Sequence, residues 1–308
     1  MAVNLAFDWT QTTELAMIDY STYNYLAVCG VALLFAYPLL YIIEKAFGFT
    51  SSMTLMELSD INNPLLRQLS TNCPGTFQHS LQVANLAGEA ALKIGANMQL
   101  VRAGALYHDI GKTKNPAFFT ENQIGENPHD HLVRPEDSAK IVIDHVANGL
   151  KLAEEAGLPK VIKDLIAQHH GKGITRYFYY KAREARPDEE VDPAPFTYPG
   201  PNPQTKEAAI LMMADACEAA TKSMSDHSEE AIAAMVGKII DGQVADGLLR
   251  ETPISFRDVE TVKKLFVERL RTAYHVRVSY PSAIKPDESK EAAATPPPHN
   301  GPKDSTPN

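Results

Sequence analysis

Histidine and aspartate side chains recur through the middle of the chain at positions where they could together hold metal ions. The set has five imidazoles and two carboxylates: His79, His108, Asp109, His145, His169, His170 and Asp215. One imidazole on an apolar helix face is usually a satisfied core residue, but several unpaired polar groups in one core would each cost about 1 to 3 kcal/mol. The set therefore needs a shared partner, and nitrogen and carboxylate ligands without cysteine suit Zn, Fe or Mn.

The carboxylate of Asp109 can bridge two ions that lie about 3.5 to 4 Å apart. The ligands expected for the first ion are His79, His108, Asp109 and Asp215, and those expected for the second are Asp109, His145, His169 and His170. Water held by two such ions ionises near neutral pH, so no side-chain nucleophile is needed to attack a phosphoester. The pattern predicts two-metal hydrolysis, with Asp109 as a catalytic residue.

Four further residues near this set could contact a substrate. Lys112 stands three residues after Asp109, where it could neutralise phosphate oxygens as a second catalytic residue or be an ordinary solvated lysine. His129 lies in a loop flanked by proline and could touch the substrate or only brace that loop. Arg176 and Tyr177 closely follow the last histidine pair, where an aromatic face could stack on a base, although such a run is more often core.

The elements that must position these residues are helices. Apolar residues recur at three-to-four spacing, no β-branched run alternates strongly, and Gly and Pro breakers fall between the segments. We therefore predict an all-α domain over 67–280, preceded by a linker over 44–66. A Pro-rich insertion over 186–203 exceeds an ordinary helix connector and should be a flap over a site or a flexible spacer. Residues 281–308, rich in Pro, Ser, Lys and Glu, should form a disordered tail.

An uncharged apolar segment near the N-terminus predicts one transmembrane helix over 23–43. At about 1.5 Å per residue its length approaches the roughly 30 Å hydrocarbon thickness of a bilayer. A buried core helix is the alternative, and a signal peptide is not indicated because no Lys or Arg precedes Lys45. Lys45 and Arg67 follow the segment, so the positive-inside rule places residues 1–22 outside and the large C-terminal part in the cytoplasm. The expected location is the inner (cytoplasmic) membrane, with a single pass through the lipid bilayer.

Composition narrows the class of partner. The 308 residues are 44% hydrophobic and 22% charged, which is a globular balance. With 29 basic and 38 acidic side chains the net charge is −9, the wrong sign for holding DNA or RNA by its phosphates. Cys29, Cys73 and Cys217 lie far apart, which excludes a disulfide framework and thiolate zinc sites. The sequence does not define the oligomeric state, so an oligomer is left open.

The order His, His-Asp, His, His-His, Asp resembles the HD-domain metal-dependent phosphohydrolases in their binuclear form. The chain is most similar to the cytoplasmic HD domain of the seven-transmembrane-HD family, from about residue 49 to residue 280. The segments that carry the likeness include FQHSLQVANLAGEAALKIGAN, AGALYHDIGKTKNPAFFTENQ, IAQHHGKGITRYFYYKA and KEAAILMMADACEAATKS. This resemblance implies a helical bundle, two divalent ions usually described as iron or manganese, and hydrolysis of cyclic di-AMP to linear pApA.

Two other functions remain open beside that one. A different HD phosphohydrolase could use the same metals on cyclic di-GMP, a nucleotide monophosphate or a dNTP. A receptor could bind the nucleotide without cleaving it, although none of the seven ligands is missing. Relatives that cleave cyclic di-GMP carry Tyr-Pro after the glycine of this motif, whereas Gly111 is followed here by Lys112-Thr113, which favours the cyclic di-AMP branch.

The chain also departs from the family. Its long members carry an extracellular sensor and seven spans, while this sequence has room for one span. We expect either a shortened member or part of a longer product.

Overall fold

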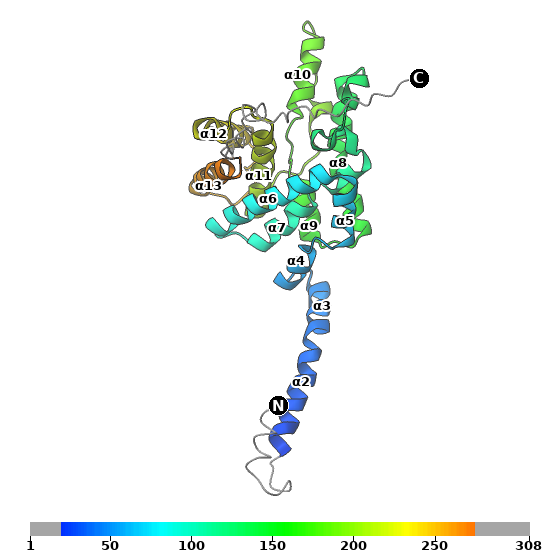
Figure 1. Cartoon of the computed structure of the whole chain (residues 1–308), viewed down its shortest axis with the longest axis vertical. Coiled ribbons are helices and arrows are strands. Elements are labelled where there is room, and N and C mark those ends of the chain that lie inside the picture. The colour runs from blue at the N-terminus through cyan, green and yellow to red at the C-terminus, as the bar shows by residue number, and fades with distance from the viewer. Residues whose placement is uncertain (1–19, 275–308) are drawn as a thin grey trace, which may run out of the picture. The chain divides into compact units, whose positions relative to one another are not determined.

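The computed structural model describes residues 20–274, and this part of the chain is helical (Figure 1). Within that range no named strand occurs, and one isolated antiparallel bridge joins Ile174 to Thr197. The prediction of an all-α domain is therefore confirmed. The expected disordered tail (281–308) and most of the expected N-terminal tail (1–22) lie outside the described residues.

Most helices follow one another with short connections, but long segments that contain the 3₁₀ helices join α7 to α8 and α10 to α11. The α-helices are α2 (Tyr20–Leu34), α3 (Ala36–Phe47), α4 (Ser52–Leu58), α5 (Pro64–Asn72), α6 (Pro74–Lys93), α7 (Met98–Tyr107), α8 (Pro135–Glu155), α9 (Lys160–Gln168), α10 (Arg176–Ala185), α11 (Lys206–Ser223), α12 (Glu229–Ala245) and α13 (Phe256–Tyr274). The 3₁₀ helices are η2 (Ile110–Lys114), η3 (Pro116–Phe118), η4 (Thr120–Asn122), η5 (Pro128–His131) and η6 (Ala194–Phe196).

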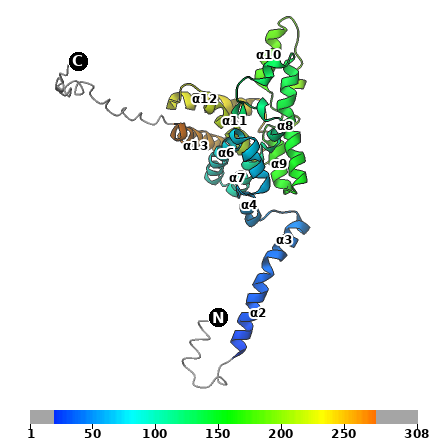
Figure 2. The same ribbon diagram turned by 45° about the vertical axis from the view of Figure 1, so that its right-hand side comes forward.

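Five helices form the centre of the domain. Helix α6 packs against α7, α11 and α13, while α7 and α11 both contact α9 (Figures 1 and 2). Fully buried apolar side chains fill the space between them, including Ala87, Ala91, Ala105, Ile166, Ile210 and Met213. Gly104 in α7 is needed for this approach, because a Cβ there would lie 2.2 Å from Cδ1 of Leu165. This close packing fixes the helices that carry the predicted metal ligands.

The segment expected to be a linker (44–66) contributes to the packed domain. Leu55 of α4 and Leu66 of α5 are buried in the main core. The Tyr107 hydroxyl at the end of α7 donates a hydrogen bond of 2.8 Å to the Leu58 carbonyl of α4. The domain therefore begins at α4, earlier than the boundary at residue 67 that we expected. The short helices α4 and α5 bury only one and two leucines, which a periodicity argument does not detect.

The Pro-rich insertion (186–203) is held to the domain. Phe196 in η6 is fully buried and lies in the same apolar cluster as Val191. Tyr198 is buried as well. The Thr175 backbone N–H donates to the Phe196 carbonyl at 2.8 Å, which joins the insertion to the start of α10. Of the two expectations, a covering segment describes it better than a flexible spacer, since its apolar residues pack against α8 and α10.

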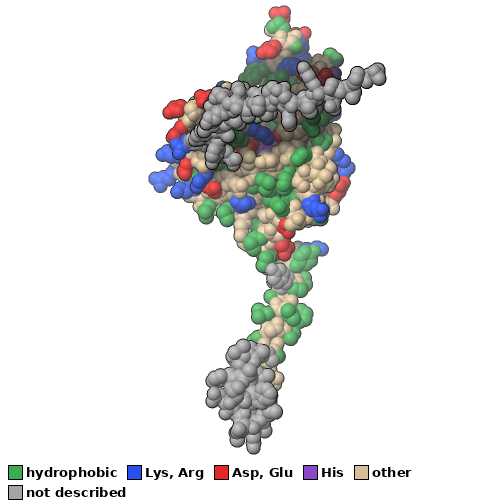
Figure 3. All heavy atoms as spheres, in the orientation of Figure 1, with side chains coloured by type: hydrophobic (Ala, Val, Ile, Leu, Met, Phe, Trp, Pro, Cys, Tyr) green, Lys and Arg blue, Asp and Glu red, His purple; other side chains and the backbone are tan. Residues whose placement is uncertain are grey.

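The apolar N-terminal segment forms two helices, which differs from the single helix expected over 23–43. No single described helix is long and apolar enough to cross a membrane, but Tyr23–Leu34 and Pro38–Phe47 meet the criterion as a pair that bends by 44°. Pro38 lacks a backbone N–H and its ring crowds the carbonyl four residues earlier, so a continuous helix is broken here. Apolar side chains such as Leu34 and Ile42 are uncovered along α2 and α3 (Figure 3).

Replacing Gly111 with alanine is expected to destabilise the domain strongly. A Cβ at this position would lie 1.9 Å from the His145 carbonyl oxygen and 2.5 Å from the Gly149 nitrogen, on the backbone of α8. Overpacking a core costs about 1 to 3 kcal/mol, and the cost here should lie at the upper end because the backbone of α8 would have to move. We therefore expect the free energy of unfolding, measured in denaturant, to fall by about 3 kcal/mol.

Gly242→Ala in α12 is the matched control for this variant, because a Cβ there meets nothing within 4 Å. It should be neutral or stabilise by up to about 1 kcal/mol, since alanine favours the helix. Equal unfolding free energies for the two variants would contradict the close approach of η2 and α8.

Candidate metal centre

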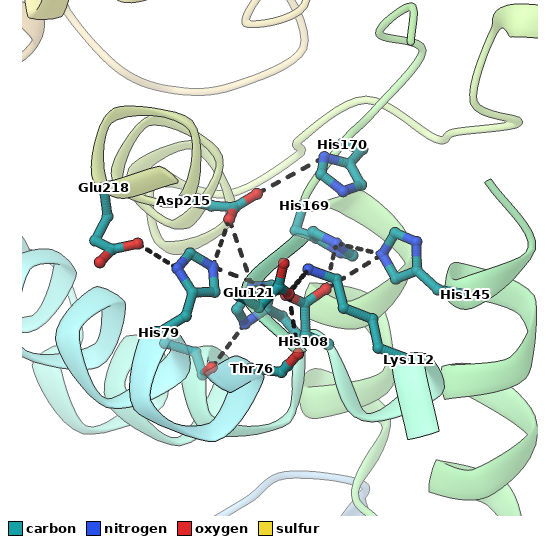
Figure 4. A network of polar contacts seen from close by, with 12 residues as sticks. Thr76, His79, His108, Lys112, Glu121, His145, His169, His170, Asp215 and Glu218 are labelled. Atoms are coloured by element: carbon teal, nitrogen blue, oxygen red, sulfur yellow. Dashed lines mark hydrogen bonds and ion pairs between the residues drawn. The ribbon is translucent and has the colours of Figure 1, made fainter. Parts of the chain in front are cut away.

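The structure brings all seven predicted ligands together in the middle of the domain (Figure 4). Helix α6 contributes His79, the end of α7 contributes His108 and Asp109, and α8 contributes His145. The end of α9 and helix α11 supply the remaining ligands, which are His169, His170 and Asp215. All are buried except His170, which is half-buried. Segments far apart in sequence meet here because the core fixes the ends of α7 and α9 against α6, α8 and α11.

The carboxylate of Asp109 lies between two groups of ligands. Its Oδ2 atom is 3.1 Å from Nε2 of His108, and its Oδ1 atom is 3.3 Å from Nε2 of His145. The Asp215 carboxylate lies on the His108 side, with Oδ1 3.6 Å from Nε2 of His108 and 3.0 Å from Nε2 of His79. Each oxygen of Asp109 therefore faces a different group, which is the arrangement that a bridging carboxylate needs.

His145 and His169 direct lone pairs at each other. Nδ1 of His145 donates to the Val142 carbonyl, and Nδ1 of His169 donates to the Ile166 carbonyl at 2.7 Å. Burial is the main cause that lowers the pKa of both rings, so both are neutral and each Nε2 is an acceptor. The two Nε2 atoms nevertheless lie 3.1 Å apart. Two acceptors at this distance repel each other unless a cation is bound there.

Two atoms at the centre are buried and, within the described range, have no hydrogen-bond partner: Oδ1 of Asp109 and Nε2 of His108. Leaving such groups unsatisfied is costly, so they indicate a missing cationic partner. The ligand atoms form two groups, each within 4.8 Å, which are His79, His108, Asp109 and Asp215, and His145, His169 and His170. Nitrogen and oxygen donors in these numbers fit two divalent cations.

Lys112 is fixed against the bridging carboxylate and is not a solvated turn lysine. Its ammonium lies 2.8 Å from Oδ2 of Asp109 and 2.7 Å from Oε1 of Glu121. Glu121 in turn accepts a hydrogen bond of 2.9 Å from the Thr76 hydroxyl at the start of α6. Burial alone would lower the pKa of Lys112, but the two carboxylates outweigh it and raise that pKa, so the ammonium stays charged. A fixed positive charge thus stands beside the ligand cluster.

A cavity of about 1640 Å³ opens over the ligands. Its wall includes three of the weaker sequence candidates. The Nε2–H of His129 donates to the Phe118 carbonyl at 2.9 Å and its ring packs against Phe178, so it is well placed to brace its loop. Arg176 pairs with Asp246 of the connection after α12. Tyr177 is 69% exposed, so it is a wall residue and not part of the core.

Three residues of the site were not singled out from the sequence. They are Glu121, Glu218 and Tyr198. The ring of Tyr198, from the Pro-rich insertion, stacks on that of His170 with centroids 4.3 Å apart. Glu218 contacts His79 from α11. A signal existed only for Glu218, which follows Asp215 by three residues and so shares its helix face.

Metal binding at the two groups should depend differently on pH. Burial disfavours the charged form of His79 and His108, but hydrogen bonds and charges of Asp215, Glu218 and Asp109 outweigh it and raise the pKa values to about 9 and about 10. In the metal-free protein both rings are therefore protonated at pH 7, and an incoming ion must displace protons.

The apparent affinity of this group should consequently rise with pH, by about tenfold per unit for each proton displaced, up to about 9 for the proton of His79 and up to about 10 for that of His108. Burial lowers the pKa of His170 as it does that of its neighbours, so the second group is already neutral and should show little change over the same range. Calorimetric titration with Mn²⁺ in buffers of different ionisation enthalpy measures the protons released. Release of no protons at pH 7 would contradict this charge assignment.

Comparison with known proteins agrees with this geometry. The sequence pattern of the HD domain matches residues 76–220, which contain all seven ligands. The helical fold is that of an HD-domain protein. The solved HD domain of the Listeria monocytogenes phosphodiesterase PgpH is 41% identical, has a TM-score of 0.66 and is matched over 100% of its length and 70% of this chain. The chain therefore belongs to the HD-domain family, with the PgpH HD domains.

A longer relative and a solved complex with a ligand are also similar to this chain. The cyclic-di-AMP phosphodiesterase PgpH of Bacillus subtilis is 41% identical over 291 residues, which are 92% of this chain and 40% of that protein. A second structure of the Listeria PgpH HD domain, in complex with cyclic di-AMP, is 42% identical and has a TM-score of 0.66; the match covers 71% of this chain and 100% of that domain. The chain thus spans less than half the length of the curated PgpH proteins it matches.

Proposed function

We propose that this protein is a metal-dependent phosphodiesterase that hydrolyses cyclic di-AMP to linear pApA. The observation that carries the proposal is the buried Asp109 carboxylate, whose two oxygens face two separate groups of nitrogen and oxygen donors. The choice of substrate is supported by the similarity to the PgpH HD domain, which has been solved with cyclic di-AMP. The seven residues would hold two divalent ions, with iron or manganese as the proposed metals.

Two bound divalent ions supply Lewis acidity and a water of lowered pKa for attack on a phosphodiester. The chain contributes the surroundings. Lys112 presents a fixed ammonium at the edge of the ligand cluster, where it can stabilise negative charge that develops on phosphate oxygens. Glu121 holds that ammonium in place, and the Thr76 hydroxyl holds Glu121. The exposed ring of Tyr177 in the cavity wall provides an aromatic face on which a base can stack.

A cleavage assay tests the proposal. Protein purified without oxygen and loaded with Mn²⁺ or Fe²⁺ is incubated separately with cyclic di-AMP, cyclic di-GMP and a mixture of dNTPs, and the products are separated by chromatography. We expect pApA from cyclic di-AMP and much slower cleavage of the others. If only another nucleotide is cleaved, that nucleotide is the substrate and the assignment of cyclic di-AMP is wrong. Tight binding of cyclic di-AMP without cleavage would indicate a receptor.

We further propose that α2 and α3 anchor the protein in the cytoplasmic membrane, with the catalytic domain on the cytoplasmic side. The support is the uncovered apolar surface of both helices and the Lys45 that follows the apolar run. The bend at Pro38 allows a broken span. The full chain should therefore sediment with membranes and resist extraction by carbonate, whereas a chain that starts at residue 49 should not. Equal release of both would exclude the anchor.

A further inference from the structure

His79 is held differently from the other buried ligand histidines. His108, His145 and His169 each donate Nδ1–H to the carbonyl three residues earlier in the same segment, which are the carbonyls of Ala105, Val142 and Ile166. Nδ1 of His79 instead contacts a carboxylate oxygen of Glu218, which lies 139 residues later in the chain. Backbone carbonyls thus orient the rings of His108, His145 and His169, whereas the buried side chain of Glu218 orients the ring of His79.

Helix α11 holds the His79 ring from both sides (Figure 4). Asp215 lies 3.0 Å from Nε2 of His79, and Glu218, one helical turn later, contacts Nδ1. Residues three apart share a helix face, so a single turn of α11 fixes both the position and the tilt of the imidazole. Glu218 is 1% exposed, and its carboxylate therefore faces only protein.

The second oxygen of Glu218 also has a partner. The Tyr274 hydroxyl at the end of α13 lies 3.1 Å from Oε1 of Glu218 and 3.3 Å from the side-chain oxygen of Gln82 in α6. His227 stacks on the Tyr274 ring with centroids 5.2 Å apart, and its Nε2–H donates to the Thr221 carbonyl. A donor from α13 thus supports the carboxylate in the position that His79 requires.

These contacts make the two groups of ligands unequal. The group with His79 has Asp215 and one oxygen of Asp109, and Glu218 adds a third carboxylate one imidazole away. The group with His145 has the other oxygen of Asp109 at 3.3 Å from His145 and, less closely, Oδ2 of Asp215 at 3.7 Å from Nδ1 of His170. A carboxylate bound to the far nitrogen of a ligand imidazole fixes its tautomer and makes it a more basic ligand.

We infer that Glu218 is a positioning residue for His79 and that, through it, the ion held by His79, His108, Asp109 and Asp215 binds more tightly than the ion beside His145. This inference rests on the proposed metal centre and adds to it a residue and an order of occupancy. By analogy with other residues that orient metal ligands, loss of the Glu218 charge should lower the affinity for the more tightly bound ion about 10- to 100-fold.

The test is metal binding, measured on the full chain near pH 9, where protons compete less for His79 and His108, by equilibrium dialysis against graded Mn²⁺ with elemental analysis. The wild type should bind two ions in two separable steps. Glu218→Gln keeps the size of the side chain and should weaken the tighter step about 10- to 100-fold while leaving the other unchanged. Glu207→Gln, the same substitution in the first turn of α11, should leave both steps as in the wild type, because Glu207 contacts only the Asn97 backbone at the start of α7.

A second variant keeps the inference testable if Glu218→Gln does not fold, which circular dichroism would show. Tyr274→Phe removes the hydroxyl that supports Glu218 but leaves the carboxylate, so it should weaken the same step by a smaller factor. Two unchanged steps in a folded Glu218→Gln protein, or equal weakening of both, would overturn the inference and leave the proposed function standing. A wild type that binds no Mn²⁺ would instead overturn the metal centre itself.

Discussion

Asp109→Asn is expected to abolish hydrolysis of cyclic di-AMP, with a loss of at least about a thousandfold in kcat, and to remove both ions together. Asparagine has the same shape but only one carbonyl oxygen and no charge. The two oxygens of Asp109 face the two ligand groups at 3.1 Å from His108 and 3.3 Å from His145, so a neutral amide cannot serve both. Because each ion contributes electrostatic stabilisation of about 10²-fold or more, loss of both should leave little turnover.

Metal content and turnover must be measured on the same preparation. Asp164→Asn in α9 is the control, since among residues 20–274 Asp164 pairs with the exposed Lys160 alone and with none of the ligands, and this variant should keep both ions and full activity. A variant that loses one ion and retains the other would show that Asp109 is not shared. Wild-type turnover by Asp109→Asn would refute the assigned centre.

The ligand set could be predicted because each member stands in a helical segment with clear apolar periodicity. His79 and His145 lie within α6 and α8, and the pairs His108-Asp109 and His169-His170 directly follow the ends of α7 and α9. Many buried polar groups in one core require a common partner, which is a strong constraint even without coordinates. The sequence also predicted two groups that share Asp109. The ligand atoms do form two groups, and Asp109 belongs to the one with His79, His108 and Asp215, with its Oδ1 atom 3.3 Å from His145 of the other.

Residues that act through others could not be found in this way. Glu121 is one of many acidic residues in polar segments, and only the folded loop brings it to Lys112 and Thr76. Glu218 shares a helix face with Asp215, but its contact with His79 depends on how α6 and α11 pack against each other. Tyr198 lies in a Pro-rich stretch with no periodicity, yet it stacks on His170. The break at Pro38 is a local effect that a hydropathy argument averages out.

Lys112→Met is expected to lower kcat about 100-fold while both ions remain bound. Methionine keeps an unbranched stem of similar volume but removes the ammonium, which lies 2.8 Å from Asp109 and 2.7 Å from Glu121. Loss of one preorganised charge beside the reacting phosphate costs about 10² to 10³ in rate. The pKa of Lys112 is raised by these carboxylates, so the lysine is charged at every working pH and contributes no alkaline limb to the rate profile.

The same variant leaves Glu121 buried without its cation, which should destabilise the protein by about 3 kcal/mol or more. The double variant Lys112→Met/Glu121→Gln separates the two effects, because it removes the unpaired charge and should recover most of the unfolding free energy without recovering kcat. Lys114→Met, on an exposed side chain in the same 3₁₀ helix, controls for the substitution itself. Recovery of kcat in the double variant would show that Lys112 acts only by neutralising Glu121, and stabilisation of phosphate charge would then have to come from other residues.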